Sequence, residues 1–111
     1  MPQTVKIGIS MPLPPEPPAV TVDPATYARE AERIGFESFW VGEHAISPVH
    51  VASYSPVFHK GQVPGFLDPF AALARASAAT STIRLGTAVT LVPEHHPIVL
   101  AKQIATLDQY S

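Results

Sequence analysis

The 111-residue sequence contains no cysteine, and this absence excludes disulfide bridges and thiolate metal sites. It also lacks an uninterrupted apolar stretch near the roughly 18 residues that a membrane helix needs. Residues 1–9 show no basic segment followed by a long apolar run, so the sequence gives no indication of a signal peptide. Together these absences lead us to expect a soluble, cytoplasmic protein.

Charge is also scarce, with seven Lys and Arg against nine Asp and Glu, for a formal net charge of −2. Because the basic residues form no cluster, we expect neither a nucleic-acid footprint nor a patch for anionic membranes. The glycine-rich GxGxxG and Walker A motifs and the GxSxG nucleophile motif are absent as well. The usual nucleotide-binding and serine-hydrolase interpretations therefore have no motif to support them.

Proline is abundant, with 13 in the chain, and its distribution is informative. Five prolines fall in residues 12–18, which predicts one rigid, extended loop. Asp23-Pro24 and Asp68-Pro69 each combine an N-cap residue with a proline suited to the first helical position. These prolines are typical of boundaries in a folded chain rather than of a disordered tract.

Hydrophobic patterns predict three strands that alternate with three helices. The strands are expected at 5–10, 38–41 and 83–89. The helices are expected from Pro24 to a C-terminal Gly35, at 70–79, and from Pro97 with Leu100, Ala101, Ile104 and Leu107 on one face. A long loop is expected over 45–67 and a shorter one over 93–96. This βα alternation predicts an α/β fold with a parallel sheet and no domain boundary within 1–111.

The most informative stretch is Phe39-Trp40-Val41-Gly42-Glu43-His44, a short apolar strand followed by an acid and an imidazole. α/β proteins place much of their chemistry just past the carboxyl ends of such strands. His44 could exchange a proton near neutral pH, or it could be an ordinary surface histidine. Glu43 could orient that imidazole or face a ligand, although a solvated loop carboxylate is the slightly favoured interpretation.

The end of the third strand is unusual because Gly86, Thr87 and Ala88 are all small. Small side chains let a flat ligand approach the backbone, where N–H and C=O groups can contact its edge. They could equally fill the narrow interior of a barrel, and the two interpretations are compatible.

The remaining histidines do not indicate a metal site. His95 and His96 are adjacent and so point apart on an extended segment, and the chain has neither HxH nor HxxxH spacing. His50 and His59 lie in the expected long loop without a nearby acid. We therefore predict no metal.

Five motifs in this order resemble the N-terminal third of the luciferase-like monooxygenase family. They are KIGI at 6–9, IGFESFWVGEH at 34–44, DPFAALA at 68–74, IRLGTAV at 83–89 and PIVLAKQIATLD at 97–108. The loop containing Tyr54-Ser55-Pro56 most resembles the F420-dependent subgroup. The resemblance covers essentially the whole chain and implies the first three βα units of a (β/α)8 TIM barrel, incomplete in this chain because eight units need roughly 250 residues.

The resemblance also implies a function. The family binds coenzyme F420 or FMN at the carboxyl ends of its strands. On the matching positions, His44 is expected to be catalytic and to handle a proton, and Glu43, Thr87, Ala88 and Val89 are expected to contact the coenzyme. A cis peptide bond is implied at Ala88–Val89. The implied reaction is hydride transfer between F420 and a small organic substrate.

Two alternatives remain open. One is an FMN-dependent monooxygenase, in which reduced flavin activates oxygen. The other is a non-catalytic binding or dimerisation piece, because family members often form homodimers through their early helices, here 70–79 and 97–110. We expect residues 1–111 alone to be inactive, since three strands cannot close a barrel.

Overall fold

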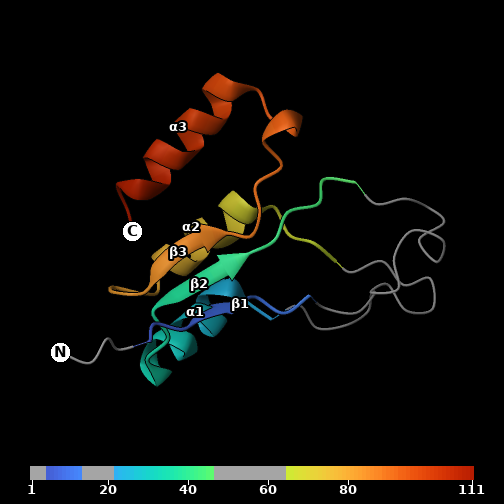
Figure 1. Cartoon of the computed structure of the whole chain (residues 1–111). Helices are drawn as coiled ribbons and strands as arrows, with labels where there is room; N and C mark the ends of the chain where they lie inside the picture. Colours follow the sequence, from blue (N-terminus) through green and yellow to red (C-terminus); the bar gives the residue numbers. More distant parts are fainter. Residues whose placement is uncertain (1–4, 14–21, 47–64) are drawn as a thin grey trace, which may run out of the picture.

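The computed structural model describes residues 5–13, 22–46 and 65–111 (Figure 1). In chain order its elements are β1 (Gly8–Ser10), α1 (Pro24–Ile34), β2 (Ser38–Val41), α2 (Pro69–Ser77), β3 (Arg84–Thr87), the short 3-10 helix η3 (Val92–Glu94) and α3 (Pro97–Asp108). The expected loop around Tyr54-Ser55-Pro56, with His50 and His59, lies outside the described residues, as does most of the proline run. In the described part of the chain, no helix is long and apolar enough to cross a membrane.

The three strands form one parallel sheet in the order β1-β2-β3. Gly8 pairs with Ser38, Trp40 pairs with Gly86, and Val41 pairs with Thr87, so the strands run in close register. Figure 1 shows α1 and α2 side by side along the sheet, and α3 standing apart from it. The predicted α/β fold is confirmed: the chain forms three βα units of the kind that begin a TIM barrel.

The Asp-Pro pairs begin two helices, as the sequence predicts. Asp23 caps α1, with its side chain accepting a hydrogen bond from the Ala25 N–H, and Asp68 caps α2 by accepting from the Ala71 N–H at 2.7 Å. Asp23 also forms an ion pair with Arg75 of α2, and this hydrogen-bonded partner lowers the pKa of Asp23. The first helix cap therefore also ties α1 to α2.

The core lies between the sheet and the first two helices. Phe39 and Val41 point from β2 into this layer and are 0% and 3% exposed. Small residues of α1 and α2 cover them, including Ala28 and Ala76, both fully buried, next to Leu73. Alanine on the facing sides lets the helices approach the sheet closely.

The opposite face of the sheet is organised around Trp40. Its indole spans the two neighbouring strands and donates a hydrogen bond to Ser38 Oγ at 2.9 Å. A Cβ atom placed on Gly8 or on Gly86 would lie 2.6 Å from the indole. Glycine is therefore needed on both flanking strands because the indole lies directly on their backbones.

The loop between α2 and β3 is held by one carboxylate. Glu32 of α1 uses Oε1 to accept hydrogen bonds from three consecutive backbone N–H groups, those of residues 81–83, at 2.6–3.0 Å, and from the Thr82 hydroxyl. These backbone donors favour the ionised form and lower the pKa of Glu32 to about 2. The start of β3 is thereby fixed relative to α1.

Two expectations about secondary structure need correction: the first and third strands are shorter than 5–10 and 83–89, and part of the expected loop at 93–96 forms η3. On the apolar face expected on α3, Leu100 is buried and Ile104 is 50% exposed. The helix packs against α2, and an apolar groove of about 760 Å³ is lined by residues of both helices.

Candidate active site

The carboxyl ends of β2 and β3 bring together the two segments that the sequence singled out. The Ala88 N–H donates to the Val41 carbonyl at 2.9 Å, which extends the pairing of the strands by one residue beyond β3. A Cβ atom on Gly42 would lie 3.5 Å from the Ala88 carbonyl oxygen, in ordinary contact. The 42–44 segment and the 87–89 segment therefore leave the same edge of the sheet side by side.

The segment after β3 presents small and apolar groups outward. Ala88 is exposed, and Val89 is 65% exposed. The Ala88–Val89 peptide bond is cis, which confirms the expectation from the resemblance. Thr87 is half-buried, and its hydroxyl is 2.7 Å from that of Thr90. This edge therefore offers an open surface whose backbone is anchored through Ala88.

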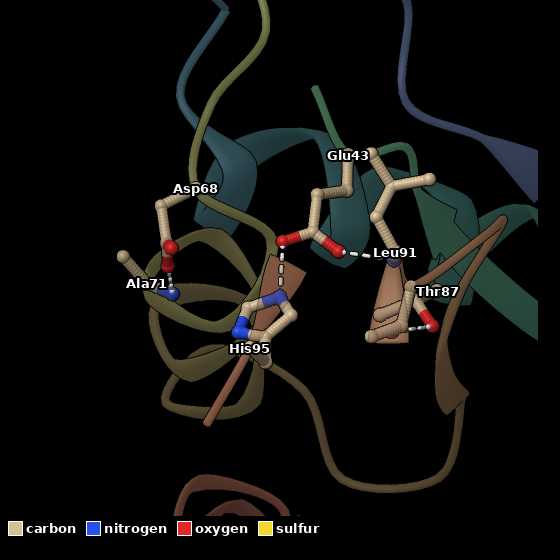
Figure 2. A network of polar contacts seen from close by, with 7 residues as sticks. Glu43, Asp68, Ala71, Thr87, Leu91 and His95 are labelled. Atoms are coloured by element: carbon tan, nitrogen blue, oxygen red, sulfur yellow. Dashed lines mark hydrogen bonds and ion pairs between the residues drawn. The ribbon is translucent and has the colours of Figure 1, made fainter. Parts of the chain in front are cut away.

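Glu43 is buried at the same edge, with 8% of its surface exposed. Its Oε2 accepts a hydrogen bond from the Leu91 N–H at 2.7 Å, and its Oε1 lies 2.6 Å from His95 Nε2. Figure 2 shows the carboxylate lying between these two groups. The slightly favoured interpretation of Glu43 as a solvated loop carboxylate is therefore wrong, because a buried carboxylate needs partners and the loop supplies them. Contact between Glu43 and a coenzyme stays a prediction.

His44 follows Glu43 in the chain, but its side chain is in contact with solvent whereas that of Glu43 is buried. His44 is exposed, and its ring packs edge-on against Phe66, with the ring centroids 4.5 Å apart. The imidazole that pairs with Glu43 belongs to His95, so Glu43 does not orient His44 as one interpretation held. The ring nitrogens of this exposed imidazole are therefore open to hydrogen bonding with a ligand.

His95 is the residue that the sequence analysis missed. Its ring is held between Glu43 and Phe70 of α2, the latter in a perpendicular arrangement with centroids 6.1 Å apart. Glu43 and His95 are 52 positions apart in the chain, so no local spacing rule relates them. From the sequence, His95 was considered only as a metal ligand, an interpretation that its spacing did not favour, and its partner in the structure is Glu43.

The described residues hold no group of three or more His, Asp or Glu side chains that could bind a metal. Ala88 and Val89 leave a small exposed surface at this edge of the sheet, and His44 is exposed at the same edge. A planar organic ring could lie against this surface, with the backbone groups of 87–89 at its rim. The chemistry of these residues is compatible with such a ring.

Comparison with known proteins agrees with this geometry. The model of the luciferase-like monooxygenase family matches residues 11–111. An uncharacterized protein of Mycobacterium tuberculosis (strain ATCC 25618 / H37Rv) is 47% identical over 95 residues, which cover 81% of this chain and 34% of that protein. Limonene 1,2-monooxygenase of Rhodococcus erythropolis is 34% identical over 80 residues, covering 72% of this chain and 17% of the relative.

A third relative, 4-hydroxyprotoasukamycin monooxygenase of Streptomyces nodosus subsp. asukaensis, is 34% identical over 77 residues, covering 69% of this chain and 17% of the relative. The chain thus spans about a third or less of the length of these relatives. The family match nevertheless takes in all three helices and the second and third strands, together with both segments of the candidate site. The chain therefore belongs to the luciferase-like monooxygenase family.

Proposed function

We propose that this chain forms one wall of the coenzyme site of an oxidoreductase that transfers a hydride between coenzyme F420 and a small organic substrate. The observation that carries the proposal is that His44 and the Ala88–Val89 segment leave the same edge of the sheet, both exposed. In parallel α/β sheets, ligands bind at the carboxyl ends of the strands, which is where these residues lie.

The proposed roles follow from the chemistry of each group. The bound coenzyme supplies the hydride chemistry, and the protein orients it and excludes competing reactions. Thr87, Ala88 and Val89 would form the surface behind the coenzyme ring. The exposed imidazole of His44 would hold or release the proton that accompanies hydride transfer, because an imidazole ring nitrogen can either donate or accept a proton.

FMN is the alternative coenzyme, and the proposal would then become an FMN-dependent monooxygenase. Its support is that two relatives are named as monooxygenases. The support for F420 is the resemblance of the loop containing Tyr54-Ser55-Pro56, which lies outside the described residues. The two versions share the same wall and the same role for His44, and they differ in the coenzyme that the wall accepts.

We also propose that the protein forms a homodimer through α2 and α3. The support is the apolar groove between these helices, which Phe70, Ile98, Val99 and Tyr110 help to line. Ile98 and Tyr110 are 75% and 74% exposed, and large apolar groups gathered in this way are typical of protein interfaces. A non-catalytic binding or dimerisation piece would use the same face.

The test of the proposed function uses the protein as its gene encodes it, with residues 1–111 alone as a comparison. The His44→Ala variant should lower kcat by about 100-fold or more, as expected for loss of a proton-transfer group, while the Kd for the coenzyme changes less than about threefold. The matched control is His96→Ala, which removes another exposed imidazole. His96 occupies the N-cap position of α3, but its side chain makes no capping hydrogen bond. An unchanged kcat in His44→Ala would remove His44 from the reaction.

A further inference from the structure

The segment after β3 has few attachments to the rest of the protein. Beyond the bond from the Ala88 N–H to Val41, the chain passes through η3, in which no residue is buried. Within the described residues, the hydrogen bonds from 89–95 to other parts of the chain are the Thr87–Thr90 hydroxyl contact and two bonds to Glu43. The course of this segment therefore depends on very few groups.

Glu43 holds both ends of the Leu91–His95 turn. One carboxylate oxygen accepts from the Leu91 N–H, and the other lies 2.6 Å from His95 Nε2 (Figure 2). Within the turn, the Glu94 N–H donates to the Leu91 carbonyl at 2.8 Å, so its two ends move together. The turn is therefore clamped as a unit to the residue that follows Gly42 at the end of β2.

We call the contacts of Glu43 with Leu91 and His95 the clamp, and its side chains are largely shielded from water and packed in place. The side chains of Glu43 and His95 are 6% and 18% exposed, and the ring of Phe70 packs perpendicular to the His95 ring. Hydrogen bonds to a carboxylate that is shielded from water are stronger than those on a surface, and leaving such a group unpaired is costly. The Glu43–His95 pair can therefore fix the turn, whereas an exposed pair would contribute little.

We propose that Glu43 and His95 are positioning residues that hold the Ala88–Val89 wall in the orientation needed for coenzyme binding. This proposal rests on the proposed function for the coenzyme, but the clamp itself acts on the backbone whether or not a coenzyme is bound. Glu43 acts on the Ala88–Val89 wall through the turn, because each of its carboxylate oxygens is bonded to one end of that turn.

The first measurement is hydrogen exchange of the backbone amides in the coenzyme-free, gene-encoded protein. Replacing His95 by Leu should reduce the protection of the Leu91 and Ala88 amides by about tenfold or more. The His95→Gln variant keeps an N–H group at a similar reach and should restore most of the protection. His96→Leu, which changes the adjacent exposed histidine, should leave both amides unchanged. If His95→Leu does not fold, His95→Asn serves instead, because its amide can be hydrated but is too short to reach Glu43.

The second measurement is the Kd for F420 and for FMN in the same variants. His95→Leu should weaken binding of the coenzyme that the protein accepts by about tenfold, and His95→Gln should come within about threefold of the unaltered protein. Unchanged amide protection in His95→Leu, or an equal loss in His96→Leu, would overturn the positioning role. If the unaltered protein binds neither coenzyme but His95→Leu still loses protection at Ala88, the clamp stands and the proposed function fails.

Discussion

Replacing Glu32 by Gln should destabilise the protein at neutral pH, because the Glu32 carboxylate holds the loop that leads into β3. Its Oε1 accepts from three consecutive backbone N–H groups and one hydroxyl, and these lower the pKa of Glu32 from 4.5 to about 2. At about 1.4 kcal/mol per pKa unit, this fall sets a ceiling of about 3 kcal/mol on the stabilisation. The side chain is only partly buried, so solvent screening reduces the expected loss to about 1–2 kcal/mol.

The pH dependence of this effect has a definite sign. Because the folded-state pKa of Glu32 lies below its unfolded value, its stabilisation is fully present above about pH 4.5 and is lost as the pH falls through about 2. Glutamine does not titrate. The difference in unfolding free energy between the unaltered protein and Glu32→Gln should therefore shrink between pH 4.5 and pH 2.

The assay is equilibrium urea unfolding of the gene-encoded protein at pH 6 and at pH 3. The matched control is Glu30→Gln, on the same helix, where the carboxylate forms an exposed pair with Arg33 at 2.8 Å and has no other hydrogen-bond or ion-pair partner among the described residues. That control should change the unfolding free energy by less than about 0.5 kcal/mol. Equal losses in the two variants, or a loss in Glu32→Gln that persists unchanged at pH 3, would refute the reasoning.

Three further predictions follow from the same geometry. Gly86→Ala should cost about 1–3 kcal/mol of unfolding free energy, since the added Cβ would lie 2.6 Å from the Trp40 indole, and a Trp40→Leu background should recover part of this loss in urea unfolding. Asp68→Ala should lower the unfolding free energy by about 1 kcal/mol, because it removes the side chain that caps α2. Asp68→Asn keeps a capping oxygen and should lose much less; equal losses in the two variants would contradict a capping role. His44→Ala should lower kcat about 100-fold with little change in unfolding free energy, because the side chain is exposed.

Much of the fold could be predicted from local signals. Asp23-Pro24 and Asp68-Pro69 begin helices where the sequence indicates, and Gly35 ends α1 in the left-handed conformation with φ of 101°. The parallel alternation of strands and helices also predicted that the residues after Val41 and Thr87 would share one edge, because parallel strands end together.

Two interactions that position the candidate site or its strands, and that the sequence did not indicate, join residues far apart in the chain. His95 meets Glu43 across 52 positions, and Glu32 meets residues 81–83 across about 50. Both carboxylates could equally have been solvated, since a single charged residue near a loop carries no signal of its partner. Their partners depend on the course of η3 and of the α2–β3 loop, which is set by the packed structure rather than by spacing.

The proposed coenzyme wall is tested most directly by titrating the gene-encoded protein with F420 and, separately, with FMN, and recording the absorbance spectrum of each mixture before and after reduction. The account predicts stoichiometric binding of one of the two coenzymes, with a spectral change that is altered in His95→Leu and restored in His95→Gln. If neither coenzyme binds, or if replacing Ala88 by a bulky Phe leaves binding and spectrum unchanged, this edge of the sheet is not the wall of a coenzyme site.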